Sequence, residues 1–279
     1  MASQLRILVA EGNTAEARSR VARLSGQTPG ESYAAVLRDI LPEVTVDLCC
    51  PADAADPPVD IASYDGVVIT GSALNAYHDM PEVRRQVEFS RAVFHSGVAF
   101  FGSCWGLQIA SVAAGGEVAL NPKPREVGFA RNIYLTDAGI THPMHAGRRR
   151  VFDALAIHSD HVVRPPPECI ITASNGHSPI QAAEIRSGRG IFWGVQYHPE
   201  FDLLDVAQVI LRYGQKLVEE GFFADMAALD ACAASLTVLA HNSSRSDIAW
   251  QFSLWDDILS ADKRTTEIAN WIRKMVEGR

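Results

Sequence analysis

The sequence predicts an α/β fold in which a mostly parallel central sheet carries helices on both of its faces. Continuous apolar runs rich in β-branched residues alternate with amphipathic helical patterns in the first half of the chain, which is typical of such a sheet. The middle of the chain instead carries short strands separated by turn residues, a hairpin-like pattern. With 279 residues, 47% of them hydrophobic and 21% charged, the chain can bury a sizeable core.

Each element is predicted from its local pattern. Strands are expected where apolar runs end at glycine, proline or polar turn residues, at 5–10, 44–50, 64–72, 98–103, 130–136, 149–160, 169–174, 180–188 and 189–200. Helices are expected where apolar residues recur every three or four positions, at 30–42, 82–97, 202–221 and from 105 onward. A short helix is also expected in the long loop between residues 11 and 30, which we expect either to border the active site or to decorate the surface.

The pattern becomes helical and richer in polar residues beyond residue 224. We therefore expect a main domain over residues 1–224 and a helical C-terminal extension over residues 225–279, with helices at 247–259 and 265–278. Trp250, Trp255 and Trp271 lie in this extension at partly helical spacing. We expect these side chains to pack the extension onto the main domain, and the alternative is a docking surface for another subunit.

The charge and the cysteine content exclude several classes of protein. The 33 acidic residues outnumber the 25 basic ones, and a net charge of −8 disfavours nucleic acid as a partner. No run approaches the roughly 20 apolar residues that span a bilayer, and the first apolar run is too short for a signal peptide, so we expect no membrane association. Five scattered cysteines favour the reducing cytoplasm over a disulfide framework, and no paired spacing predicts a metal site.

A cysteine stands at a predicted strand-to-helix corner, in the stretch "GSCWG". Gly102 and Gly106 flank Cys104 in the G-x-C-x-G pattern of a nucleophile elbow, where the backbone crowds closely on either side of the nucleophile. The helix that begins near Trp105 directs its N-terminal N–H groups and its dipole toward the sulfur, which favours a thiolate and later an oxyanion. An isolated motif of this kind is more often a small buried cysteine.

A histidine and a glutamate follow a later buried strand, in the stretch "GVQYHPEF". A thiol nucleophile needs an imidazole that takes and returns protons, and the imidazole needs an acceptor that fixes its tautomer. His198 and Glu200 supply these two groups. The combination with Cys104 makes the catalytic interpretation of the elbow far more specific.

The stretches "GSCWGLQ" and "QYHPE" resemble the two signature motifs of class I, triad-type glutamine amidotransferases. The resemblance covers roughly residues 5–220, and it implies a flavodoxin-like fold and a catalytic triad of Cys104, His198 and Glu200. The stretch "VVITGS" is similar to the strand and loop that complete the family's oxyanion hole, which implies that the N–H groups of Gly71 and Trp105 bind the oxyanion.

The same resemblance implies how the substrate is held. Gln108 matches the family's glutamine that helps to hold the substrate. Glu126, Val127 and Gly128 fall where the family contacts the α-amino and α-carboxylate groups of glutamine. His158 and Asp160, in the stretch "IHSDHV", are expected to support the site, to face a partner or to be purely structural.

The implied chemistry is hydrolysis of the side-chain amide of glutamine through a γ-glutamyl thioester, with no metal or organic cofactor. No phosphate-binding or pyrophosphatase loop is found, so ammonia would pass to a separate synthetase subunit. The first alternative is a γ-glutamyl peptide or amide hydrolase with the same triad. The second alternative is a catalytically idle binding or regulatory module. A third alternative, a cysteine-based stress protein on a related α/β fold, is disfavoured because such a protein would not carry the His-Pro-Glu stretch. A homo-oligomer is left open.

Overall fold

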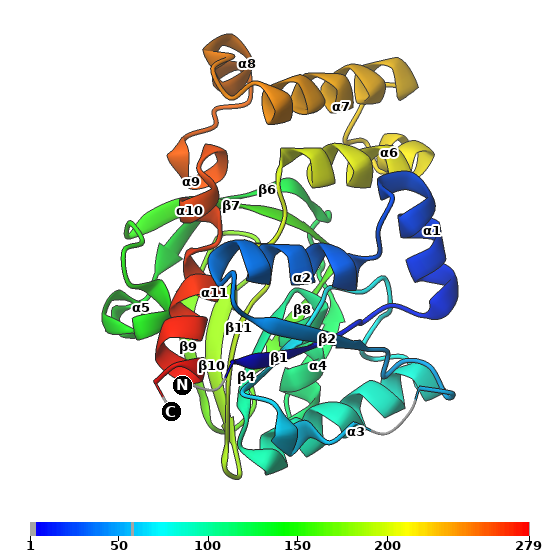
Figure 1. Cartoon of the computed structure of the whole chain (residues 1–279). Coiled ribbons are helices and arrows are strands. Elements are labelled where there is room, and N and C mark those ends of the chain that lie inside the picture. Colours follow the sequence, from blue (N-terminus) through cyan, green and yellow to red (C-terminus); the bar gives the residue numbers. More distant parts are fainter. Residues whose placement is uncertain (1–3, 57–58, 279) are drawn as a thin grey trace.

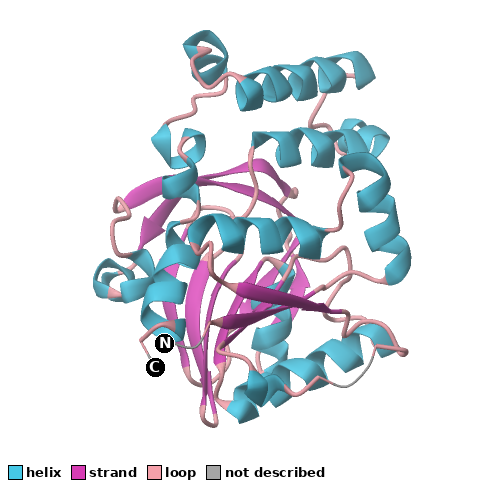
Figure 2. Ribbon diagram, in the orientation of Figure 1, coloured by secondary structure: helices cyan, strands magenta, loops and turns pink. Residues whose placement is uncertain are grey.

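A nine-stranded sheet in the order β2-β1-β3-β4-β11-β10-β9-β6-β7 forms the centre of the molecule (Figures 1 and 2). The computed structural model describes residues 4–56 and 59–278. One half of the sheet is parallel, with strands β2 (Thr45–Cys49), β1 (Arg6–Ala10), β3 (Gly66–Ile69), β4 (Ala99–Ser103) and β11 (Gly190–Val195). This parallel half confirms the fold class expected from the continuous apolar runs.

The other half of the sheet is antiparallel, as the hairpin-like middle of the sequence predicts. Its strands are β10 (Ala182–Ser187), β9 (Cys169–Ser174), β6 (Glu126–Leu135) and β7 (Val151–His158). A separate two-stranded ladder pairs β5 (Glu117–Leu120) with β8 (Asp160–Arg164). The change of strand direction falls between β11 and β10, beside the strand that leads to the candidate histidine.

The two faces of the parallel half are buried against different helices. Alternate residues of β1 show this, because Ile7 and Val9 belong to one core cluster while Leu8 and Ala10 belong to the other. The first cluster includes side chains of α2 (Pro29–Ile40) and of the C-terminal helix α11 (Thr266–Trp271), and the second includes those of α3 (Pro81–Ser96) and α4 (Trp105–Ala113). Both faces of the strands are therefore buried, which explains their nearly continuous apolar sequences.

Helix α6 (Leu203–Glu219) covers the antiparallel half and carries α7 (Met226–His241) on its outer side (Figure 1). Asp202 and Asp205 form a reciprocal capping box at the start of α6, as Thr28 and Glu31 do at the start of α2. The short helix expected in the loop after β1 is present as α1 (Ala15–Ser25) and lies beside α6.

The C-terminal extension returns to the central core. Trp271 is fully buried, its ring centroid lies 5.7 Å from that of Phe101 in β4, and a Cβ atom on Gly66 in β3 would lie 2.8 Å from its ring. Trp250 and Trp255 are instead 80% and 63% exposed. Packing is therefore found for one of the expected tryptophans and not for the other two. The boundary at residue 224 stays a prediction.

The helix expected over residues 247–259 is wrong as a single element. It is divided into α8 (Ser246–Gln251) and α9 (Asp256–Leu259). Ser253 between them has a φ of 51°, a left-handed conformation that interrupts a helix, and its carbonyl accepts a hydrogen bond from Arg131. The remaining short elements are η1 (Ile61–Ser63), α5 (Asp137–Thr141), η2 (Pro143–His145), α10 (Ala261–Arg264) and the π-helix η3 (Ile272–Val276).

Candidate functional site

Cys104 lies at the corner between β4 and α4, with φ 52° and ψ −101°. Its backbone N–H donates a 2.7 Å hydrogen bond to the carbonyl of Val195, which ties the corner to the end of β11. The flanking glycines are required by close approach: a Cβ on Gly102 would lie 2.8 Å from Cα of Gly106, and one on Gly106 would lie 2.7 Å from the carbonyl oxygen of Ile69. The left-handed conformation belongs to the cysteine itself, the geometry expected of a nucleophile elbow.

His198 follows β11 and is held from several sides. The side-chain Nδ1 of His198 lies 2.7 Å from Oε1 of Glu200, and its ring stacks on the ring of Phe201 with the centroids 4.0 Å apart. The backbone N–H of His198 donates a 2.7 Å hydrogen bond to the carbonyl of Leu155. The imidazole is almost fully buried. Because Nδ1 faces the carboxylate, Nε2 is the nitrogen that remains to exchange a proton with the thiol of Cys104, whose sulfur lies 3.8 Å from the carbonyl oxygen of Ile157.

The electrostatic environment of His198 favours its charged form. Burial lowers the pKa of this histidine, but the negative charges of Glu200 and Cys104 and the hydrogen bonds to both groups outweigh burial and raise it to about 10. An imidazolium beside the sulfur stabilises a thiolate, and it can later supply a proton to a leaving amine.

The loop after β3 packs directly against the histidine. A Cβ atom on Gly71 would lie 2.7 Å from Cε1 of His198, so this position accepts only glycine without a shift of the ring. The carbonyl of Gly71 accepts hydrogen bonds of 3.1 Å from the side chains of Asn13 and Thr70, and Asn13 also accepts from the N–H of Ala73. These contacts hold the loop in one position beside the sulfur.

A buried carboxylate beneath this loop was missed by the sequence analysis. Glu11 is 2% exposed, and its Oε1 accepts hydrogen bonds from the backbone and side-chain N–H groups of Asn13 and from Thr70 at 3.0–3.3 Å. Its Oε2 accepts a 2.6 Å bond from the N–H of Gly30 at the start of α2. Burial raises the pKa of Glu11 despite these donors. Its position directly after the first apolar strand was the only available signal.

Cys104, His198, Glu200 and Gly71 line one cavity of about 480 Å³. The floor comes from the corner and from the ends of β3 and β7, and the walls come from α1, α2 and α6. The cationic side chains that line the cavity are Arg20, Arg125, Arg212 and Lys216. The cavity lies within the range of small-molecule sites, roughly 300–1,000 Å³.

Gln108 and the segment from Glu126 to Gly128 are not among the residues that line this cavity. Gln108 is buried, and its Nε2 donates to the carbonyl of Asp160 at 3.1 Å and to Oε1 of Gln196 at 3.2 Å. Val127 packs with the cluster under α6, and Gly128 has a φ of 75° beside Val206. In this structure these residues surround the cavity rather than enter it, and Arg125 is the neighbour of the segment that reaches it.

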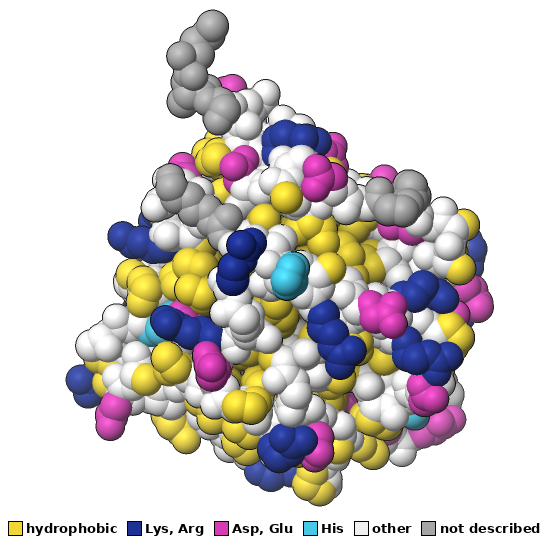
Figure 3. Space-filling view, turned by 90° about the horizontal axis from the view of Figure 1, so that it is seen from below, with side chains coloured by type: hydrophobic (Ala, Val, Ile, Leu, Met, Phe, Trp, Pro, Cys, Tyr) yellow, Lys and Arg dark blue, Asp and Glu magenta, His cyan; other side chains and the backbone are white. Residues whose placement is uncertain are grey.

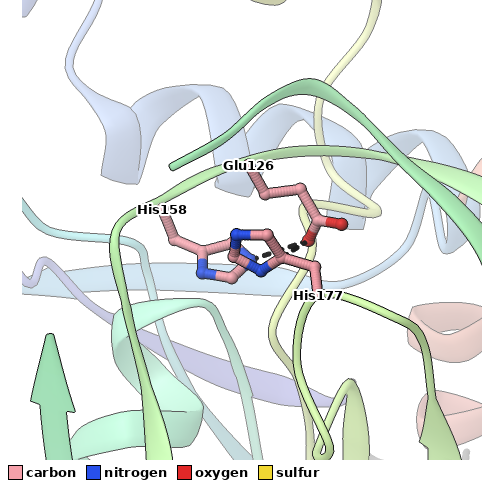
Figure 4. Close-up of side chains that lie close together, drawn as sticks. All are labelled: Glu126, His158 and His177. Atoms are coloured by element: carbon pink, nitrogen blue, oxygen red, sulfur yellow. Dashed lines mark hydrogen bonds and ion pairs between the residues drawn. The ribbon is translucent and has the colours of Figure 1, made fainter. Parts of the chain in front are cut away.

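Glu126 lies in a buried cluster with His158 and His177 (Figure 4). Its Oε2 lies 2.9 Å from Nε2 of His158, and its carboxylate also accepts from the amides of Asn175 and Gln181 at 2.7 and 2.8 Å. Burial raises the pKa of Glu126, but His158 and these amide donors outweigh burial and lower it below its usual value.

The nitrogens of this cluster make hydrogen bonds within the protein. Nδ1 of His158 lies 2.9 Å from the carbonyl of Asp160, while Nε2 lies 2.9 Å from the carboxylate of Glu126. Nε2 of His177 donates to the carbonyl of Pro124 at 2.7 Å. The contact between Glu126 and His158, with its supporting amides, holds β6 against β7 next to the cavity.

Residues 31–214 match the family model of glutamine amidotransferase class-I. The chain belongs to this family. It is 35% identical to a gamma-glutamyl-L-1-hydroxyisopropylamide hydrolase from Pseudomonas sp over 277 residues, which cover 98% of this chain and 94% of that protein. It is also 36% identical to the glutamine-hydrolysing GMP synthase of Xanthomonas axonopodis pv. citri (strain 306) over 161 residues, 56% of this chain and 29% of that protein.

Solved structures share the fold over nearly the whole chain. A glutamine amidotransferase from Thermotoga maritima superposes with a TM-score of 0.64 at 13% identity and covers 99% of both chains. A glutamine amidotransferase from Methylobacillus flagellatus gives a TM-score of 0.61 at 16% identity over 98% of this chain and 96% of that one. These structures confirm the fold, and the match to the family model confirms the family expected from the motifs.

The surface and the helices add two observations on the setting of the site. Basic and acidic side chains are interspersed with hydrophobic ones over the face in Figure 3, in keeping with the scattered charges of the sequence. Within residues 4–56 and 59–278, no helix is long and apolar enough to cross a bilayer.

Proposed function

We propose that this protein hydrolyses the side-chain amide bond of a γ-glutamyl compound with Cys104 as the nucleophile. The observation that carries the proposal is the convergence of Cys104, His198 and Glu200 on one cavity, with the His198–Glu200 contact at 2.7 Å. The Pseudomonas relative supports it, since its name gives it a γ-glutamyl amide as substrate and it matches this chain along almost all of its length.

The reaction proceeds by two acyl transfers. The Cys104 sulfur attacks the amide carbon, and the N–H groups of Gly71 and Trp105 stabilise the oxyanion that forms. Trp105 is the first residue of α4, so its N–H has no acceptor within the helix. When the carbon–nitrogen bond breaks, His198 gives its proton to the leaving amine and a γ-glutamyl thioester remains.

Hydrolysis of the thioester restores the enzyme. His198 takes a proton from water, the hydroxide attacks the thioester carbon, and the sulfur leaves as the thiolate while glutamate is released. Glu200 keeps the imidazole in the required tautomer throughout. We propose that Gln108 supports the glutamyl part of the substrate indirectly, through its hydrogen bond to the carbonyl of Asp160. Glu126, Val127 and Gly128 would support it through the position of strand β6, on which they lie.

A second candidate function is a glutaminase that supplies ammonia to a separate synthetase. It is favoured by the matches to GMP synthases, of which this chain spans about three tenths of the length or less. The γ-glutamyl amide is favoured over glutamine because the match to the γ-glutamyl amide hydrolase runs along 98% of this chain and 94% of that protein.

The test is release of glutamate from glutamine and from a panel of γ-glutamyl amides and dipeptides, with Cys104→Ala as the blank. Turnover of the larger amides well above that of glutamine supports the proposal. Slow turnover of glutamine alone supports the ammonia donor, and stimulation by a synthetase from the same cell would identify its partner. No turnover, with Cys104 unreactive toward a glutamine-mimicking alkylating agent, would leave an idle binding module.

The cysteines bear on the cellular compartment of the protein, and the family match bears on its domain boundary. All five cysteines are free, which supports a reducing compartment such as the cytoplasm. We also propose that residues 1–224 form the main domain and residues 225–279 a helical C-terminal extension, since the family match at residues 31–214 ends before residue 225. Association into a homo-oligomer is an outcome that sedimentation of the purified chain would reveal.

A further inference from the structure

Several cationic side chains line the cavity, and most of them have a carboxylate partner. Arg125 makes two hydrogen bonds to Glu220, at 2.8 and 3.0 Å, and Lys216 lies 4.0 Å from the same carboxylate. Arg20 on α1 is paired with Glu16 at 2.8 Å. Glu220 neutralises Arg125 and Lys216 within the protein, whereas the pair of Arg20 with Glu16 is exposed and weak, so Arg20 keeps most of its positive charge toward the cavity.

Arg212 is the exception. It projects from α6 into the cavity, and among the described residues its guanidinium has no hydrogen bond or ion pair; its nearest aromatic ring is that of Tyr213, with the centroid 5.6 Å away. Burial lowers the pKa of Arg212, and the positive charge of Arg20 lowers it further. A guanidinium does not lose its proton in a protein, so this charge is left partly desolvated and uncompensated.

Arg20 and Arg212 both line the cavity where α1 packs against α6, and the positive charge of Arg20 acts on Arg212. Two guanidinium groups in one partly enclosed place repel each other unless an anion lies between them. Arginine binds carboxylates through paired, parallel hydrogen bonds, and such charge-assisted bonds are about twice as strong as neutral ones. The wall formed by α1 and α6 therefore has the properties of a carboxylate site.

We propose that Arg212, assisted by Arg20, binds a carboxylate of the γ-glutamyl substrate and so selects substrates by charge. The inference rests on the proposed function, because it names the ligand of the same cavity. The carboxylate has two sources: the α-carboxylate of the glutamyl group, or a carboxylate on the leaving amine, as in a γ-glutamyl dipeptide. Both are bound by the same chemistry.

The test compares Arg212→Gln with Arg212→Lys and with Arg91→Gln, a matched control on the exposed side of α3. Two substrates separate the two sources: γ-glutamylglycine, whose leaving amine carries a carboxylate, and γ-glutamyl methylamide, whose leaving amine does not. We expect Arg212→Gln to raise KM for γ-glutamylglycine about ten- to hundredfold with a smaller change in kcat. Arg212→Lys should recover part of this loss, and Arg91→Gln should match the wild type.

A rise in KM for the dipeptide alone assigns Arg212 to the leaving-group carboxylate, and an equal rise for both substrates assigns it to the α-carboxylate. An unchanged KM for both overturns the inference. Calorimetry measures the dissociation constant of γ-glutamylglycine in the Cys104→Ala background, with and without Arg212→Gln. This measurement tests the carboxylate site without relying on turnover. If the wild type lacked hydrolytic activity but the dipeptide bound and Arg212→Gln abolished binding, the proposed function would fail while the carboxylate site would stand.

Discussion

Cys104 and His198 depend on each other at the scale of single residues. The backbone of Cys104 is left-handed at the start of α4, and the imidazole of His198, the candidate base, is almost fully buried between Glu200 and Phe201. Neither group would be reactive in isolation: a buried histidine loses its charge, and a thiol with an ordinary pKa near 8.5 is mostly protonated at neutral pH. His198 keeps its charge here because the negative groups beside it, Glu200 and Cys104, raise its pKa.

The first prediction concerns this raised pKa. Cys104→Ala removes one of the negative groups that hold the pKa of His198 at about 10, so the pKa should fall while burial and Glu200 continue to act. NMR titration of the His198 ring in the two proteins measures the difference. An unchanged pKa would contradict a thiolate–imidazolium pair.

The sign of the pH dependence follows from the same shift. A histidine whose pKa is raised from 6.5 to about 10 stabilises the folded state most fully below pH 6.5. The contribution declines as the pH rises toward 10 and is absent above it. Denaturant unfolding from pH 6 to 10 should show this decline in the wild type and a shallower one in His198→Gln.

The second prediction concerns Gly71. Gly71→Ala places a methyl group 2.7 Å from Cε1 of His198 unless the ring moves, and a displacement of about 1 Å at a reacting group lowers the rate by roughly a hundredfold. We expect a fall in kcat of that order and a smaller change in stability. Gly176→Ala is the matched control, because a Cβ there meets no atom within 4 Å. Equal activity of the two variants would count against a role for the loop.

At the scale of elements, the C-terminal extension is connected to the site. Arg264 in α10 donates to the carbonyl of Phe201 at 3.1 Å and to that of Ile258 at 2.7 Å, and the ring of Phe201 stacks on His198. An element outside the matched family region therefore helps to position the candidate base.

The third prediction tests this connection. Arg264→Ala should lower kcat several-fold with little change in KM, because Phe201 loses the hydrogen bond that fixes its backbone while the cavity lining is retained. Lys263→Ala, an exposed neighbour on the same helix, should have wild-type kinetics. A pH profile that shifts with Arg264→Ala would show that His198 is affected, whereas a loss of stability with unchanged kcat would make the contact purely structural.

Elements also show where local patterns succeed. Strand β1 is buried on both faces, with Ile7 and Val9 in one core cluster and Leu8 and Ala10 in the other. Such a strand needs apolar residues at every position, and this continuous apolar run can be read from the sequence. The division between α8 and α9 is different, since the interruption at Ser253 is stabilised by Arg131, a residue from strand β6 far away in the chain. Local periodicity carries no information about such a partner.

At the scale of the whole molecule, a buried charge cluster fastens the extension to the main domain. Arg148 makes hydrogen bonds of 2.6 and 2.7 Å to the carboxylate of Glu267 in α11, and both side chains are almost completely buried. Burial raises the pKa of Glu267, but the charge and hydrogen bonds of Arg148, with help from His145, outweigh burial and lower it to about 2. The cluster therefore stabilises the fold above pH 4.5, and its contribution declines as the pH falls toward 2.

The fourth prediction follows from that burial. Arg148→Ala leaves the carboxylate of Glu267 uncompensated and should lower the free energy of unfolding by about 3–5 kcal/mol. Arg149→Ala is the matched control, because its exposed ion pair with Asp256 is worth at most about 1 kcal/mol. Denaturant unfolding of the three proteins measures both effects, and similar midpoints for the two variants would refute the assignment.

The sequence by itself determined the α/β alternation, the corner at Cys104 and the His-Pro-Glu stretch after a buried strand. These features depend on residues close in sequence, where glycine spacing and apolar periodicity carry the information. Only the tertiary structure decided which side chains reach the cavity: Arg125 and Arg212 line it, Glu126 is held in contact with His158, and Glu11 supports the loop at Gly71. It also decided that Trp271 is buried in the central core while Trp250 is exposed. The reason is physical: the burial and the partner of a polar or aromatic side chain are set by segments distant in sequence, and local patterns do not record how those segments pack.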